Sequence, residues 1–301
     1  MAIAVPRSAA QLGQHAEERA GRSTGPMSRR RRARIGLAVR VVVALVVAVL
    51  MAFPLWVMVI TAVSGNSVFS TELELWPRRV TLVNFHRVFD AWPVGAWFAN
   101  SVTVTALTTA LTVVVSVMAG YGFAKLRFPF KGPLFLLLLA TMMIPTQAIL
   151  VPQFRLVNGM GLVGTFWAVI IPQAAATFGI FLSRQFMIAI PDSLIEAAKL
   201  DGAGPVRIFW SIVLPLCKPL LAVLTLITLM YQWNDFLWPL IVLKVPELYT
   251  LTIGLQFLQG QYRTDYGALM AMTLITVGPL VVLFLLFQRW FVQGFATTGI
   301  R

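Results

Sequence analysis

The most distinctive polar segment of the chain lies at residues 191–219, between two strongly apolar stretches. It carries the charged side chains of Glu196, Asp201 and Arg207, together with glycines and prolines that favour turns. These residues contain no nucleophile beside a base and no metal-ligand cluster, so they are unsuited to covalent or metal-assisted catalysis. We therefore interpret the segment as a surface that contacts another protein.

Local signals predict two short helices in this segment. Ser193 stands three residues before Glu196, which is the spacing of a capping box. Gly202 suits the left-handed turn that ends a first helix. Gly204 and Pro205 suit the N-cap and the first position of a second helix. The segment is therefore expected to form a helix–turn–helix.

The second predicted helix has its own apolar pattern. Val206, Phe209, Trp210 and Val213 recur at helical spacing and predict one apolar stripe. Two interpretations stay open on these grounds alone. In one, the two helices rest on the lipid surface and Glu196 only caps its own helix. In the other, the charged rim binds a partner while the stripe packs on the chain's own helices.

The composition indicates what must position this loop. Apolar residues make up 58% of the chain and charged residues 12%, against about a half and about a quarter in typical soluble domains. The chain is therefore predicted to be an all-α membrane protein. Residues 1–35 are expected to be a disordered, basic cytoplasmic leader, and residues 36–301 a six-helix transmembrane domain. The six helices are predicted at 41–62, 99–122, 132–152, 164–185, 213–235 and 267–289.

The distribution of lysine and arginine predicts the orientation. With the amino terminus inside, 18 of the 24 positive charges fall on cytoplasmic segments. Both termini and the loop between the fourth and fifth helices are then cytoplasmic. The net charge of +13 thus reports topology. The arginine cluster at residues 29–34 suits an anchor beside anionic lipid, and no nucleic-acid partner is expected.

Small and aromatic residues in the predicted spans suggest packing roles. Gly120 and Gly122 end the second predicted helix, where we expect close helix packing through small residues. Six tryptophans fall near the predicted membrane interfaces, and we interpret them as an aromatic belt. Those near the outer interface are Trp97, Trp167, Trp233 and Trp238, and those near the inner one are Trp210 and Trp290.

Motifs of nucleotide binding and metal catalysis are missing from the sequence. It has no G-x-x-x-x-G-K-[ST] and no H-E-x-x-H, and its two histidines, His15 and His86, lack partners at metal spacing. No metal or cofactor site is therefore expected. The predicted helix centres carry no ionisable residue, and the nearest is Asp235. The candidates for solute contact are Asn100, Gln147, Gln173, Gln232, Trp233 and Asn234.

The loop resembles a known family pattern. The residues that carry the resemblance are Glu196-Ala197-Ala198, Asp201-Gly202-Ala203, Phe209, Leu214-Pro215 and Pro219. In this order and spacing they resemble the EAA loop of ABC-importer permeases. The segment around Trp233-Asn234-Asp235 is similar to the MalG-like group of carbohydrate-uptake permeases. The resemblance covers roughly residues 36–301.

The resemblance implies a multi-pass permease of the plasma (inner) membrane that is not itself an enzyme. Its partners would be two cytoplasmic ATPase subunits that bind ATP and Mg²⁺, a second related permease, and an extracytoplasmic binding protein that delivers a carbohydrate or glycerol-phosphate-like solute. Residues 243–265 are the candidate contact for that binding protein. The residues that couple to the ATPase would be Glu196, Ala197, Ala198, Asp201, Gly202, Ala203, Arg207 and Phe209.

Two other classes of function are alternatives to an ATP-driven permease. A secondary transporter or channel would work without an ATPase, but the absence of a charge from the helix centres disfavours an ion-coupled carrier. An intramembrane enzyme or a structural membrane subunit is disfavoured by the lack of a nucleophile–base pair or metal cluster. Assembly with an ATPase subunit would distinguish an ABC-importer permease from both alternatives.

Overall fold

The computed structural model describes residues 26–65, 75–77, 79–259 and 264–296. Within these residues the regular structure is helical, and extended pairing is limited to one isolated bridge between Ser64 and Val80. The chain divides into two compact units, residues 1–57 and 58–301.

The first helix, α2, runs from Pro26 to Val63 and contains Pro54. It begins well before the predicted start at residue 41, and it includes residues 26–35 of the predicted leader. Arginine, which makes up five of the ten residues 26–35, is a good helix former, and a helix already nucleated in the apolar span extends readily through this stretch. Residues 1–25, the rest of the predicted leader, lie outside the described residues.

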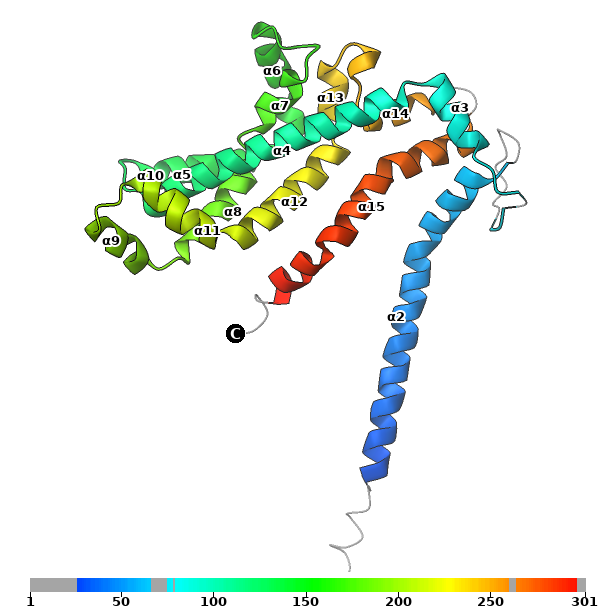
Figure 1. Ribbon diagram of the computed structural model, residues 1–301, viewed down its shortest axis with the longest axis horizontal. Helices are drawn as coiled ribbons and strands as arrows, with labels where there is room; N and C mark the ends of the chain where they lie inside the picture. Colours follow the sequence, from blue (N-terminus) through cyan, green and yellow to red (C-terminus); the bar gives the residue numbers. More distant parts are fainter. Residues whose placement is uncertain (1–25, 66–74, 78, 260–263, 297–301) are drawn as a thin grey trace, which may run out of the picture. The chain divides into compact units, whose positions relative to one another are not determined.

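The second unit holds the remaining helices, shown in Figure 1. In chain order they are α3 (Val83–Ala91), α4 (Val94–Lys125), α5 (Lys131–Thr141), α6 (Thr146–Gly159), α7 (Trp167–Gln173), α8 (Thr177–Ile188), α9 (Asp192–Leu200), α10 (Pro205–Ile208), the π-helix η1 (Phe209–Val213), α11 (Leu214–Leu216), α12 (Lys218–Asn234), α13 (Leu237–Val242), the 3₁₀-helix η2 (Pro246–Leu248), α14 (Leu251–Phe257) and α15 (Tyr266–Ala296).

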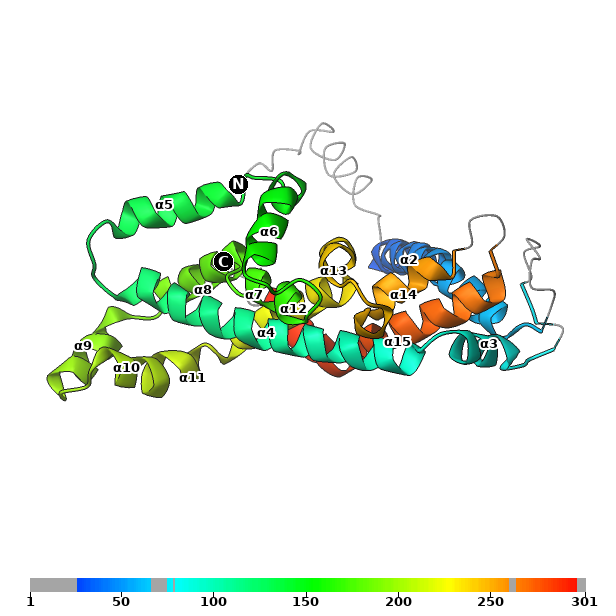
Figure 2. The ribbon, with the colours of Figure 1, turned by 90° about the horizontal axis from the view of Figure 1, so that it is seen from above.

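The long helix α4 is the central element of this unit. It lies alongside α8 and α12 (Figures 1 and 2), with α9 near one end and α3 near the other. The approach to α8 is close because small residues meet there. A Cβ atom on Gly120 would lie 2.4 Å from the Cβ of Ser183, and one on Gly179 would lie 2.4 Å from the Oγ of Ser116. The predicted role of Gly120 in helix packing is therefore confirmed.

Buried indoles connect the helices, and the predicted aromatic belt is wrong for three of its six tryptophans. Trp97 is 1% exposed and donates its Nε1–H to the carbonyl of Pro246 at 2.9 Å. Trp233 donates to the carbonyl of Thr276, and Trp238 to that of Ala168. A large ring that finds both apolar packing and a carbonyl partner is more stable inside the bundle than at its surface. Trp167 and Trp210 of the predicted belt are exposed.

Among the residues that the structure describes, four helical segments are long and apolar enough to cross a membrane, or up to six if each of two bent pairs counts as one span. The predicted third helix is two helices, α5 and α6, bent by 103°. Pro145, the N-cap of α6, causes this break because the residue before a proline disfavours helix. The predicted fifth helix is also bent, by 78° at Cys217, and α12 begins only at Lys218.

Two glycines of α4 allow a matched test of this packing. Gly120→Ala should lower the apparent midpoint of thermal unfolding in detergent, because its Cβ has no room against Ser183. Gly122→Ala should leave the midpoint unchanged or raise it, since nothing lies within 4 Å of that Cβ and alanine favours helix by about 1 kcal/mol. Equal midpoints for the two variants would contradict the close approach of α4 and α8.

Candidate functional site

The polar loop folds as the predicted helix–turn–helix. Helix α9 ends at Leu200, and Gly202 adopts a φ of +81°, in the left-handed region. The N–H of Gly202 bonds to the carbonyl of Lys199, and the N–H of Ala203 bonds to that of Ala198. These two bonds form a Schellman motif, which satisfies carbonyls that the helix end would leave free. Gly204 then caps α10, as predicted.

The buried and exposed faces of this loop separate its residues into two groups. Ala198 and Phe209 are buried, and Ala203 is partly buried, in an apolar cluster with Val117 and Tyr121 of α4. The predicted coupling residues that remain exposed are Glu196, Ala197, Asp201, Gly202 and Arg207. The sequence pattern thus combines residues that hold the loop on the bundle with residues that are free to meet a partner.

Three polar contacts attach the loop to the end of α4. The Tyr121 hydroxyl donates to the carbonyl of Pro205 at 3.1 Å. The Lys125 ammonium donates to the carbonyl of Ile190 and to a carboxylate oxygen of Asp192, both at 2.6 Å. The side chain of Lys125 is only 5% exposed. Sequence reasoning counted Lys125 only as a charge that sets topology, because its partners are more than 60 residues away.

Two predictions about the loop are wrong. The capping box does not form, since Pro191 is the N-cap of α9 and no side chain caps the helix. Ser193 therefore lies inside the first turn, where it is not placed to accept from the Glu196 N–H. The predicted apolar stripe also does not form one face of the helix. Phe209 and Val213 are buried, whereas Val206 and Trp210 are exposed.

The buried positions of the second helix are instead Ile208, Phe209, Val213 and Cys217. The wider turn of η1 between Phe209 and Val213 changes the phase of the helix. This π-helix ends two residues before Pro215, which lacks the N–H that a regular α-helix would need there.

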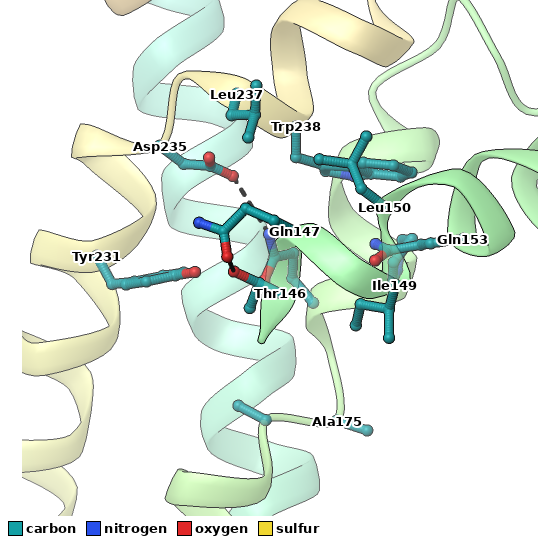
Figure 3. Close-up of a pocket in the computed structure, with 13 residues that line it drawn as sticks. Thr146, Gln147, Ile149, Leu150, Gln153, Ala175, Tyr231, Asp235, Leu237 and Trp238 are labelled. Atoms are coloured by element: carbon teal, nitrogen blue, oxygen red, sulfur yellow. Dashed lines mark hydrogen bonds between the residues drawn. The ribbon is translucent and has the colours of Figure 1, made fainter. Parts of the chain in front are cut away.

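A cavity of about 380 Å³ lies between the start of α6, the end of α7 and the end of α12 (Figure 3). Tyr231 and Asp235, from the end of α12, face Thr146 and Gln147 at the start of α6. Asp235 follows α12 directly, and its carboxylate accepts a hydrogen bond from the Nε2 of Gln173 at 3.2 Å. The complete lining is Thr146, Gln147, Ile149, Leu150, Gln153, Pro172, Gln173, Ala175, Ala176, Tyr231, Asp235, Leu237 and Trp238.

Two of the six predicted solute-contact residues, Gln147 and Gln173, line this cavity. The other four do not. Asn100 donates to the carbonyls of Glu247 and Tyr249, Trp233 and Gln232 are buried, and Asn234 donates to the carbonyl of Met230 on its own helix. Helical spacing explains the difference, because residues 232–235 point in different directions around the end of α12 and only Asp235 faces the cavity.

Other predicted positions can be placed as well. Gly254 of α14 packs closely on Trp97, and residues 260–263 of the predicted binding-protein contact lie outside the described residues. Within the part of the chain that the structure describes, no group of three or more His, Cys, Asp or Glu side chains could hold a metal ion.

Comparison with known proteins then decides the family. Residues 112–297 match the family model described as "Binding-protein-dependent transport system inner membrane component". The chain belongs to this family. It is therefore a transport permease subunit of the ABC-importer type, located in the membrane, and ATP hydrolysis belongs to a separate subunit.

Relatives agree over most of the chain. It is 38% identical over 226 residues to the arabinooligosaccharides transport system permease protein AraQ of Halalkalibacterium halodurans, covering 75% of this chain and 81% of that protein. It is 33% identical over 271 residues to the sn-glycerol-3-phosphate transport system permease protein UgpE of Yersinia pestis, covering 87% and 96%.

A solved structure shares the fold of this permease. It belongs to a bacterial ABC transporter involved in the import of the acidic polysaccharide alginate, and it aligns with a TM-score of 0.77 at 22% identity. The alignment covers 87% of this chain and 98% of that chain.

The contact between Lys125 and Asp192 predicts a pH dependence of the loop. Lys125 holds the pKa of the Asp192 carboxyl below its usual value of 3.8, through its hydrogen bond first and its charge second. A lowered pKa in the folded state stabilises the loop above the unfolded pKa, and the stabilisation is lost as the pH falls through the folded value.

Hydrogen exchange of α9 should therefore be slower in the wild type than in Asp192→Asn near pH 6, and the difference should shrink below pH 3.8 and vanish only below the lowered pKa of Asp192. Comparing both proteins at each pH cancels the intrinsic exchange rate. A difference that persists unchanged at the lowest pH would contradict the ion pair.

Proposed function

We propose that this permease imports a carbohydrate or a related polyol, and that residues 191–219 couple it to a cytoplasmic ATPase. The observation that carries the coupling role is an exposed acidic helix, α9, held on the end of α4 by buried apolar and polar contacts. The names of its relatives support the solute class, since they include an oligosaccharide and a polyol phosphate.

The exposed side of the loop has the composition of a docking surface. Leu200 is 90% exposed and Val206 is 71% exposed, and they stand beside the charged side chains of Glu196, Asp201 and Arg207. Apolar groups flanked by charges are typical of protein interfaces, where the apolar part contributes affinity and the charges select the partner. We propose that Glu196 meets a complementary site on the ATPase.

The attachment to α4 suits the transmission of motion. Phe209 packs against Tyr121 with ring centroids 5.1 Å apart, and the Tyr121 hydroxyl and Lys125 ammonium bond the loop backbone. A loop fixed in this way moves with α4 when the ATPase closes, because close-packed interfaces transmit displacement instead of absorbing it.

The remaining assembly follows from the same proposal. The permease has six spans, counting each bent pair as one, with both termini and the coupling loop in the cytoplasm. Two ATPase subunits bind ATP and Mg²⁺, a second related permease completes the pathway, and an extracytoplasmic binding protein delivers the solute. The basic segment before residue 36 lies beside the anionic inner leaflet.

Charge reversal at Glu196 tests the coupling role. Glu196→Lys should reduce ATP-driven uptake by at least about tenfold, since an unfavourable charge at a docked interface costs more than about 1.4 kcal/mol. The membrane fold should be unaffected because the side chain is exposed and caps nothing. Uptake into proteoliposomes and co-purification of the ATPase are the two measurements.

Asp90→Lys is the matched control, because Asp90 is an exposed carboxylate on α3, at the other end of α4. This variant should keep ATP-driven uptake and should still co-purify with the ATPase. Normal ATP-driven uptake by Glu196→Lys, or uptake by a wild-type preparation that contains no ATPase, would overturn the proposal.

A further inference from the structure

The cavity between α6, α7 and α12 has an unusual charge for its position. Asp235 is the only ionisable acid among its lining residues, and no lysine, arginine or histidine lines it. Its other polar side chains are neutral: Thr146, Gln147, Gln153, Gln173 and Tyr231. A negative side chain without a facing cation gives the cavity a definite preference for one charge class of ligand.

The carboxylate of Asp235 is held in place and still has acceptor capacity. Gln173 donates to its Oδ2, and the Thr252 hydroxyl donates to its backbone carbonyl, which fixes this turn at the end of α12. An ionised carboxylate has about four acceptor sites. Gln173 and the backbone N–H groups of Trp238 and Phe236 use part of this capacity and hold the carboxylate in place, and the remainder is free for a donor that enters the cavity.

The rest of the lining suits a hydroxyl-rich molecule. Gln147 is exposed at the start of α6 and faces Asp235, so its amide can both donate and accept. Tyr231 presents an exposed ring and hydroxyl from α12, with both polar and apolar contact surface. The volume of about 380 Å³ lies within the usual range of small-molecule sites, roughly 300–1,000 Å³.

We propose that this cavity is a solute-binding subsite on the permease itself, selective for uncharged polyhydroxylated solutes and unfavourable to anionic ones. Asp235 accepts hydrogen bonds from solute hydroxyls, whereas a phosphate or carboxylate on the solute meets a like charge that no lining cation offsets. The inference rests on the proposed function and decides a point that it leaves open, the charge of the solute.

The test uses the complete transporter, this permease with its partner permease and ATPase, in lipid nanodiscs without the binding protein. Saturation-transfer NMR measures the binding of three neutral trisaccharides, arabinotriose, xylotriose and maltotriose, and of the anionic trigalacturonate. At least one neutral probe should bind saturably to the wild type, and trigalacturonate should not.

Two variants then examine the role of charge. Asp235→Asn should lower the affinity for the neutral probe by about fivefold or more, because hydrogen bonds to a charged acceptor are stronger than those to a neutral one. It should also reduce the discrimination against trigalacturonate. Gln147→Lys, at an exposed position, should allow trigalacturonate to bind. Asp90→Asn removes an exposed carboxylate outside the cavity and should change nothing.

The outcomes separate the two proposals. Saturable trigalacturonate binding to the wild type, no binding of any neutral probe, or unchanged binding in Asp235→Asn would overturn the subsite. Each of these leaves the ATPase-coupled function intact if the same preparation shows ATP-driven uptake. Loss of the ATPase from the wild-type complex would instead overturn the proposed function.

Discussion

The rest of the site depends on the packing of α4 against α8 and the loop that follows it. Gly120 brings the backbones of α4 and α8 together at Ser183, and one turn later Lys125 reaches the carbonyl of Ile190, where α8 has ended. The close helix approach thus brings a cation to the start of α9. Without that approach the ammonium would have no carbonyl to satisfy it, and burying it would be strongly unfavourable.

The two functional regions use helix ends in different ways. At the loop, the Schellman motif and the Lys125 contact satisfy the backbone around α9, so the exposed side chains stand on a rigid base. At the cavity, α6 begins, α7 ends and α12 ends within one small volume. Backbone that leaves a helix inside an apolar bundle needs polar partners. The Thr252 hydroxyl donates to the carbonyl of Asp235, and the Thr112 hydroxyl donates to that of Gln173. The side chains of Asp235 and Gln173 then line the cavity.

Sequence reasoning succeeded where a residue's own backbone preference decides the structure. Gly202 and Gly204-Pro205 have the predicted conformations because glycine and proline act locally. It failed where a neighbouring element decides. The π-helix before Pro215 changed the phase of the apolar positions, and Pro191 displaced Ser193 from the cap. Three tryptophans predicted at an interface, Trp97, Trp233 and Trp238, are buried, and carbonyls from distant segments accept their N–H groups.

The sequence by itself determined that the chain is a helical membrane protein with a polar helix–turn–helix between its later spans. Composition and charge-free length are properties of each segment, and turn residues act on their immediate neighbours. Only the tertiary structure decided that Lys125 and Tyr121 fasten the loop, and that Asp235, not its neighbours at 232–234, faces a cavity with Gln147 and Gln173. Contacts between residues more than 60 positions apart depend on how helices pack, which no local pattern specifies.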